Sequence, residues 1–227
     1  FFLENSWPHL SIVYQILTSY QSSRPKDPRF DHIFMSNIIR NLRAPAIAER
    51  ECLEKVISKY LMENPDELAW VANKFEQIIS HYVNDDDTPF PITPIIHLFK
   101  ENLEIPSDFA MEIFWHTLFP LLRGRHAGLI YPLLKDIFTV YFDAYPQLAL
   151  EMIPLYLKLW PQARATRQML FLRFLAFLLE NLDEDGFEQM VKPVFEFYAL
   201  VTRSQHKKVV EQAFAVWGNV VLIPRLL

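Results

Sequence analysis

The 227-residue sequence predicts an all-α fold, an α-α superhelix of about five to six helical hairpins. Three observations support this prediction. Apolar residues recur at the i, i+3, i+4, i+7 spacing of amphipathic helices in almost every segment. Only four glycines are present, and sixteen prolines divide the chain into short segments. With 51% hydrophobic and 22% charged residues, the chain has enough apolar material for a sizeable core.

The first predicted helix begins after Ser6, a residue type that caps helix N-termini, and Pro8 is tolerated because it lies in the first turn. Its apolar face contains Trp7, Leu10, Val13, Leu17 and Tyr20. The helix ends near Ser22, before a loop at 23–28 that contains two prolines. A second helix is predicted between this loop and Pro45. Its apolar stripe consists of Phe30, Ile33, Phe34, Ile38 and Leu42.

The same period predicts nine further helices along the rest of the chain. They fall at residues 46–62, 66–83, 92–103, 107–122, 127–143, 146–159, 163–181, 185–202 and 205–222.

A proline followed by two apolar residues recurs along the chain, and this recurrence favours stacked hairpins. The intervals from Pro94 to Pro132, from Pro120 to Pro154 and from Pro154 to Pro193 are 38, 34 and 39 residues. These intervals bracket the length of a two-helix HEAT or armadillo repeat, in which each helix buries its apolar face against the neighbouring repeat. We therefore expect residues 1–227 to form a single HEAT-like helical-repeat domain, a solenoid of HEAT/armadillo type.

A closed helical bundle is the alternative that the same periodicity allows. A compact chain of this length has a radius of gyration of about 17 Å, so small-angle scattering distinguishes the two architectures. A value that low would exclude the extended stack.

Charge and cysteine content restrict the partners and the compartment. The 22 lysines and arginines against 27 aspartates and glutamates leave a net charge of -5, which argues against nucleic acid as the main ligand. The lone Cys52 forms no internal disulfide and is expected in the core, so we expect a reducing compartment, the cytoplasm or the nucleus.

No apolar stretch has the roughly 20 residues of a membrane span, and Phe1 to Asn5 lacks the apolar region of a signal peptide. We therefore expect no membrane partner. The sequence starts without methionine, and residues 216–227 are still apolar, with Arg225 as their single charge. Both ends are therefore expected to be cuts in a longer solenoid.

Candidate catalytic and metal-binding residues do not converge in the sequence. The seven histidines stand apart, and the one acid and histidine pair at helical spacing, Glu112 and His116, is typical of a solvated pair. Asp85 to Asp87 lacks the glycine and the final glutamate of a calcium loop, and Asp185 suits a helix N-terminus. Nucleophile elbows, Walker loops and zincin motifs are missing from the sequence. We expect no enzyme, no metal and no cofactor.

Basic residues gather at three predicted turns. They are Arg123, Arg125 and His126; Arg164 and Arg167; and Arg203, His206, Lys207 and Lys208. Cations near helix C-termini are ordinary, because they interact favourably with the last carbonyls. In a solenoid, however, stacked turns also form a continuous strip that binds protein partners.

Several segments, in order along the whole chain, resemble the B-prime type regulatory subunits of the type 2A serine/threonine protein phosphatase. The segments similar to that family are Ser6-Trp7-Pro8-His9-Leu10, Ala48-Glu49-Arg50-Glu51-Cys52-Leu53, Leu118-Phe119-Pro120-Leu121, Leu157-Lys158-Leu159-Trp160-Pro161 and Met169-Leu170-Phe171-Leu172. A last block contains Phe187, Met190, Pro193, Phe195, Ser204, His206, Glu211, Ala213, Trp217 and Asn219. The resemblance implies HEAT-like repeats that join a scaffold subunit and a catalytic subunit and direct substrate choice.

The resemblance also implies a groove for short Leu-x-x-Ile-x-Glu peptides, lined in the family by a His-Arg-x-Tyr helix and a second, basic helix. Here the first stretch falls on Ser58-Lys59-Tyr60-Leu61, where Lys59 alone keeps a matching charge. The second falls near Asp108 to Met111, which contains no cation. A peptide glutamate would lose charge-assisted hydrogen bonds worth about 1.5 to 3 kcal/mol each, so we expect weak or altered recognition of this motif.

These observations lead to one functional expectation and one alternative. The chain is expected to be a non-catalytic regulatory subunit that binds the phosphatase scaffold and catalytic subunits, together with substrate or adaptor proteins that carry short linear motifs. Lys59, Arg123 and Arg125 are the candidate partner-binding residues. The alternative is a generic helical-repeat adaptor protein that no longer binds the phosphatase.

Overall fold

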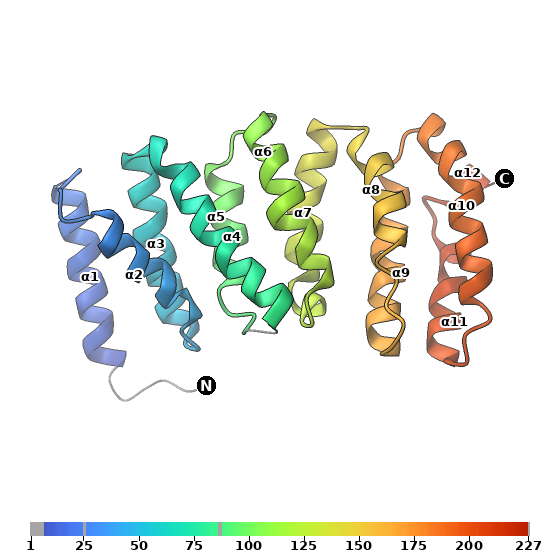
Figure 1. Cartoon of the computed structure of the whole chain (residues 1–227), viewed down its shortest axis with the longest axis horizontal. Helices are drawn as coiled ribbons and strands as arrows, with labels where there is room; N and C mark the ends of the chain where they lie inside the picture. Colours follow the sequence, from blue (N-terminus) through green and yellow to red (C-terminus); the bar gives the residue numbers. More distant parts are fainter. Residues whose placement is uncertain (1–6, 25, 86–87, 227) are drawn as a thin grey trace. The chain divides into compact units, whose positions relative to one another are not determined.

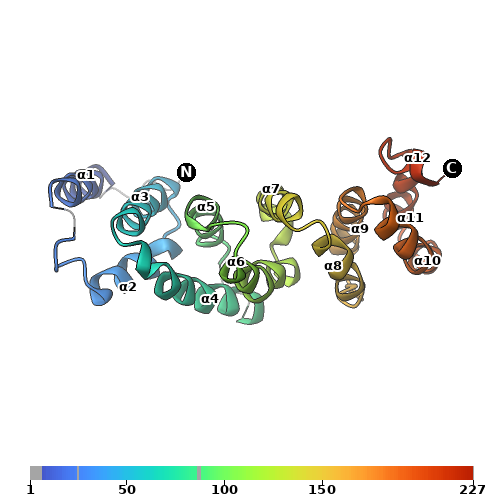
Figure 2. The ribbon, with the colours of Figure 1, turned by 90° about the horizontal axis from the view of Figure 1, so that it is seen from above.

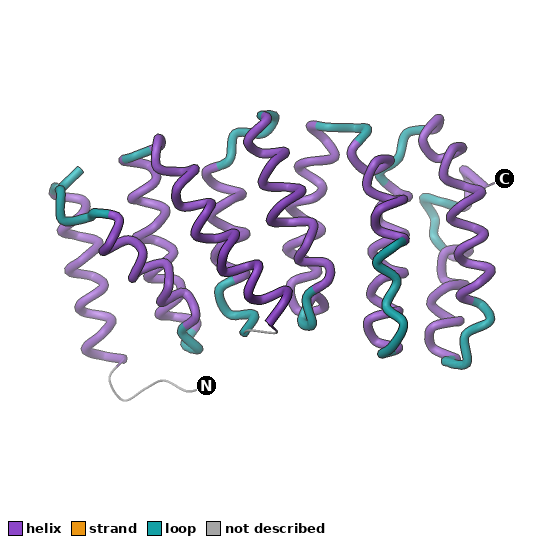
Figure 3. The backbone as a smooth tube through the Cα atoms, in the orientation of Figure 1, coloured by secondary structure: helices purple, strands orange, loops and turns teal. Residues whose placement is uncertain are grey.

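A computed structural model describes residues 7–24, 26–85 and 88–226. These residues form helices joined by short turns, with no strand in the part of the chain that the structure describes (Figure 3). They group into two compact units, residues 1–134 and 135–227. The all-α helical-repeat fold predicted from the sequence is confirmed, whereas the assignment of residues 1–227 to a single domain stays a prediction.

The helices of the first unit lie in two layers (Figures 1 and 2). One layer contains α1 (Trp7–Ser23), α3 (Ile47–Glu63) and α5 (Ile92–Asn102). The other contains α2 (His32–Arg40), α4 (Leu68–Asp85) and α6 (Asp108–Ile113). Within the first layer α3 packs against both α1 and α5, and α2 packs against α4 in the second. The chain passes from one layer to the other at every turn, which is the arrangement of stacked helical hairpins.

The core of the first unit lies between its two layers. Leu53, Val56 and Ile57 of α3 are fully buried, and Phe75 of α4 meets Phe99 of α5 edge to face, with ring centroids 5.4 Å apart. An edge-to-face pair adds about 0.5 to 1.5 kcal/mol to the free energy gained by burying the rings. The apolar spacing of the sequence therefore identifies the buried face of most helices. It is wrong at Val13 of α1 and Ile33 of α2, which are 57% and 75% exposed, and α1 buries Tyr14 and Gln21 instead.

Side-chain caps start some of the helices. Asp31 Oδ1 accepts a hydrogen bond from the Phe34 backbone N at the start of α2, and Ser107 Oγ accepts one from the Ala110 backbone N at the start of α6. Such caps satisfy amide groups that have no partner within the helix. The cap predicted at Ser6 lies outside the described residues.

The helix predicted at 107–122 is helical over residues 108–123, but it is not one continuous α-helix. The α-helix stops at Ile113, and the chain continues as a π-helical turn (Phe114–Leu118) and a 3₁₀ turn (Phe119–Arg123). Pro120 contributes to the change of helix type, because it has no backbone N–H to donate to the carbonyl of His116 and its ring crowds that carbonyl. Apolar periodicity continues through the break, and the Phe119 side chain stays buried there.

The second unit also has two layers (Figure 2). In one layer α9 (Ala165–Glu180) packs against α11 (Lys207–Phe214), and in the other α8 (Leu148–Leu157) packs against α10 (Glu184–Val201). The helix α7 (Ala127–Ala144) begins in the first unit and ends in the second.

Aromatic rings fill the second unit. Tyr156 of α8 stacks on Phe171 of α9 with centroids 4.1 Å apart, and Trp160 meets Phe171 and Phe197 edge to face at 5.2 Å and 5.1 Å. The aromatic content that the sequence assigns to core packing is thus found in ring clusters between helices.

The helix predicted at 205–222 is also shorter than expected. Its α-helical part, α11, ends at Phe214, and a 3₁₀ turn (Ala215–Gly218) leads to Asn219 and then to α12 (Ile223–Leu226). Asn219 Oδ1 accepts a hydrogen bond from the Val221 backbone N, while its Nδ2 donates to Glu180 Oε1 of α9. A glycine followed by an asparagine favours this turn over helix continuation.

None of the described helices combines the length and the apolar composition needed to cross a bilayer.

Candidate protein-binding groove

An open groove of about 740 Å³ runs along the surface of the first unit between α3 and α5. Helix α3 supplies one side and α5 the other, and we call it the α3–α5 groove. Its lining consists almost entirely of charged or long flexible side chains: Glu51, Glu54, Lys55, Ser58, Lys59, Met62, Glu63, His97 and Glu101.

Helical spacing determines which side chains of α3 reach the groove. Successive residues turn by about 100°, so residues 51, 58 and 62 lie along one line of the helix, residue 54 lies to one side of it and residue 59 to the other. The sequence therefore places two different sets of side chains on the two flanks of this line.

The flank that faces α5 is acidic. His97 Nδ1 lies 3.1 Å from Glu54 Oε1, and Ser58 Oγ donates a hydrogen bond of 3.1 Å to Glu101 Oε2. Burial raises the pKa of the Glu54 carboxyl, His97 opposes that rise, and the negative charges of Glu101 and Glu51 increase it. Glu51 and Glu101 are therefore each close enough to repel the carboxylate of Glu54.

The flank that faces α1 carries the lysines. Lys59 Nζ donates a hydrogen bond to Ser22 Oγ of α1, so its ammonium group is directed away from α5. Lys55 lies near Cys52: burial raises the pKa of the Cys52 thiol, and the Lys55 charge lowers it. Cys52, expected in the core, is half-buried on this flank.

Met62 lies at the C-terminal end of α3 and is 76% exposed. A large apolar side chain that stays in water loses the free energy that burial would provide, about 1.5 to 3 kcal/mol. Single exposed apolar residues are common, but this one lines a groove, where a ligand can cover it.

Arg123 and Arg125 do not join Lys59. They flank Gly124 in the turn before α7, where Gly124 rests on the ring of Tyr82 near the end of α4. Lys59 lies near the end of α3, which leads into the start of α4. Helix α4, whose 18 residues rise by about 27 Å, runs from one place toward the other. The turn and Lys59 are thus near opposite ends of α4 in the first unit.

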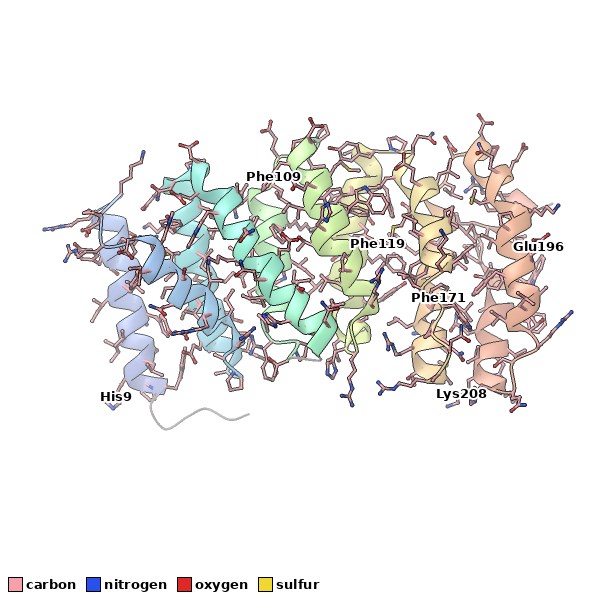
Figure 4. The ribbon with its side chains drawn as sticks, in the orientation of Figure 1. His9, Phe109, Phe119, Phe171, Glu196 and Lys208 are labelled. Carbon is pink, nitrogen blue, oxygen red and sulfur yellow. The ribbon has the colours of Figure 1, made fainter. Side chains whose placement is uncertain are left out.

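The other chemical candidates stay dispersed. Glu112 and His116 are both exposed on the segment that contains α6 and the π-helical turn. In the second unit Lys207 and Glu211 form a 3.6 Å ion pair on α11, and Lys208 projects from the edge where α11 begins (Figure 4). Among the described residues, no group of three or more His, Cys, Asp and Glu side chains is placed to hold a metal ion.

Sequence reasoning placed Lys59 in this region but missed the acidic side of the groove. A signal was available on α3, because Glu51, Glu54 and Met62 follow helical spacing on a surface face. His97 and Glu101 come from α5, about 40 residues further along the chain, and only the packing of α5 against α3 brings them to the groove.

A second, more polar pocket of about 480 Å³ lies at the turn before α2. Within its lining, His32 Nε2 lies 2.7 Å from Glu67 Oε2, and the His32 ring stacks on Trp70 with centroids 4.2 Å apart. These contacts hold the start of α2 to the start of α4, so the pocket belongs to the turn structure.

The sequence profile of the family described as protein phosphatase 2A regulatory B subunit (B56 family) matches residues 1–225. The B' kappa isoform of the 57 kDa regulatory subunit of serine/threonine protein phosphatase 2A from Oryza sativa subsp. japonica is 25% identical over 229 residues, covering 95% of this chain and 44% of that protein. The kappa isoform from Arabidopsis thaliana is 26% identical over 230 residues, covering 94% and 45%.

The 56 kDa regulatory subunit delta 2 isoform from Schizosaccharomyces pombe is 22% identical over 228 residues, covering 96% of this chain and 36% of that protein. The chain spans less than half the length of these relatives. The match nevertheless covers almost the whole chain and agrees with the helical repeat and with the ordered segments of the sequence. The resemblance is confirmed: this chain belongs to the B56 family of protein phosphatase 2A regulatory B subunits.

Proposed function

We propose that the protein is a non-catalytic regulatory subunit of the type 2A serine/threonine protein phosphatase. It binds the scaffold and catalytic subunits and directs substrate choice. The observation that carries the proposal is the family match over residues 1–225 of a chain built from helical hairpins. Helical repeats suit this role, because stacked turns and helices present long surfaces to other proteins.

The proposal assigns the chemistry of dephosphorylation to the catalytic subunit. Relatives from two plants and a fission yeast are all named as regulatory subunits. The lone cysteine supports a reducing compartment, and we place the protein in the cytoplasm or nucleus on that ground.

Co-purification tests the assembly. The complete chain, mixed with purified scaffold and catalytic subunits, is expected to elute with both from a size-exclusion column, while the chain alone hydrolyses no phosphopeptide. A mixture of scaffold and catalytic subunits without the chain is the control. Separate elution would overturn the proposal and favour the adaptor that no longer binds the phosphatase.

The proposal also concerns how the protein recognises short peptide motifs in its partners. Lys59 is the single cation that the family's His-Arg-x-Tyr stretch leaves here, and its ammonium group is engaged with Ser22. We therefore expect a Leu-x-x-Ile-x-Glu peptide to bind weakly. Titration of such a peptide into the chain measures this, and low-micromolar binding would contradict it.

A further inference from the structure

The α3–α5 groove combines an apolar anchor point with an excess of negative charge. Four carboxylates line it, against two lysines, and the lysines lie on the flank toward α1. Glu54 and Glu101 lie on the flank toward α5, and Glu51 lies on the line beside Glu54. The structure places no cation of the described residues within ion-pair distance of Glu51 or Glu101. A ligand that brought positive charge to this flank would relieve their mutual repulsion.

The length of the groove fits a short peptide. The lining residues of α3 run from Glu51 to Glu63, a rise of about 18 Å at 1.5 Å per residue. An extended chain advances about 3.3 Å per residue, so about five residues span the groove. A small cation or metabolite would leave most of it unfilled.

The contacts across the groove set the spacing of the ligand's side chains. Ser58, with Glu101, lies one helical turn before Met62, and Glu54 lies two turns before it. One turn rises about 5.4 Å and two residues of an extended strand advance about 6.6 Å, so alternate side chains of an extended peptide meet successive turns of α3. An apolar side chain on Met62 would then place the next two same-face side chains beside Glu101 and Glu54.

We propose that the α3–α5 groove binds an extended segment of a partner protein in which an apolar residue is followed, or preceded, at two and four residues by lysine or arginine. Met62 covers the apolar residue, and the carboxylates of Glu101, Glu54 and Glu51 receive the cations. This inference rests on the proposed function and deepens it, because it names the chemistry of the protein segments that the regulatory subunit recruits. The proposed segment carries basic residues, whereas the short motif that the family resemblance implies carries a glutamate.

Fluorescence anisotropy with labelled peptides and the complete chain tests the proposal. The probes are Leu-Ser-Arg-Ser-Arg and its reversed order, a charge-swapped Leu-Ser-Glu-Ser-Glu, and an anchorless Ser-Ser-Arg-Ser-Arg. One of the two basic orders is expected to bind at least about tenfold more tightly than the charge-swapped peptide, and more weakly as salt is raised. Equal binding of the basic and acidic peptides, or tighter binding of the acidic one, would overturn the proposal.

Two variants connect the binding to the groove. Glu101→Lys is expected to weaken the basic peptide about tenfold, whereas Glu112→Lys, an exposed charge reversal on α6 outside the groove, leaves it unchanged. Met62→Ala is expected to weaken binding of the leucine peptide about fivefold and to leave binding of the anchorless peptide unchanged. The two changes, Met62→Ala in the protein and leucine to serine in the peptide, form a double-mutant cycle that isolates the apolar contact. Both Met62 and Glu101 are exposed, so both variants should fold, and circular dichroism verifies this. If Glu112→Lys abolished the preference for the basic peptide and Glu101→Lys did not, the binding site would lie outside the α3–α5 groove.

Holoenzyme assembly separates this proposal from the proposed function. Glu101→Lys and Met62→Ala should still elute with the scaffold and catalytic subunits. If the native chain binds the basic peptide but not the two subunits, the proposed function is overturned and the proposal about the groove is supported. If it assembles but shows no peptide preference, the groove proposal fails alone.

Discussion

Gly124 lies so close to the ring of Tyr82 that the position leaves no room for a side chain. A Cβ atom at this position would lie 2.5 Å from Tyr82 Cε1, and both Gly124 and Tyr82 are buried. We expect Gly124→Ala to lower the free energy of unfolding by about 1 to 3 kcal/mol, because the turn and the ring must move apart. Urea denaturation measures the loss.

Gly218 provides the matched control. It is exposed, and a Cβ atom there would meet no atom within 4 Å. Gly218→Ala should change the free energy of unfolding by no more than about 0.5 kcal/mol. Equal losses at positions 124 and 218 would contradict the steric explanation.

Tyr198 links stability to alkaline pH. Burial raises the pKa of its phenol above the ordinary value of 10.0. The unfolded chain therefore loses this proton at a lower pH than the folded protein does, and the stabilisation present below pH 10 declines as pH rises above it. Tyr198→Phe should show a shallower decline of unfolding free energy above pH 10, measured by urea denaturation at several pH values. Parallel curves for the two proteins would contradict this account, and any constant offset near neutral pH cancels in the comparison.

Helix α2 depends on its first cap. Asp31 Oδ1 accepts a hydrogen bond of 2.7 Å from the Phe34 backbone N, and the helix has only nine residues. Asp31→Ala should lower the free energy of unfolding by about 1 kcal/mol, whereas Asp31→Asn, which caps nearly as well, should cost much less. Thermal denaturation compares the two variants, and similar losses for both would mean that the carboxylate acts through its charge.

The segment after α6 illustrates how an element can keep its apolar period and lose its α-helical backbone. Phe114, Leu118 and Phe119 are buried as a helix at 107–122 would bury them, but they do so through π-helical and 3₁₀ turns. Burial depends on which side chains share a face, and Pro120 alters the hydrogen bonds without greatly changing that face. Periodicity therefore predicts the buried residues here better than it predicts the backbone.

At the scale of the whole chain, net charge leads to a prediction about partners. The charge of -5 repels a nucleic-acid backbone. We expect no shift of a labelled DNA duplex by about 10 μM chain at about 0.15 M salt in a mobility assay, with polylysine as the positive control. A complex that persisted at this salt concentration would contradict the prediction.

The sequence by itself determined the all-α repeat, the buried face of most helices and the family, because the 3.6-residue period and the ordered segments are local properties of the chain. It also placed Lys59 on the helix that lines the α3–α5 groove. Tertiary structure alone decided what surrounds that residue. Glu101 and His97 reach the groove because α5 packs beside α3, and Lys59 is drawn to Ser22 because α1 packs on its other side. Such contacts join residues about 40 positions apart, and a pattern with the period of one helix contains no information about which side chains the next hairpin will bring to its surface.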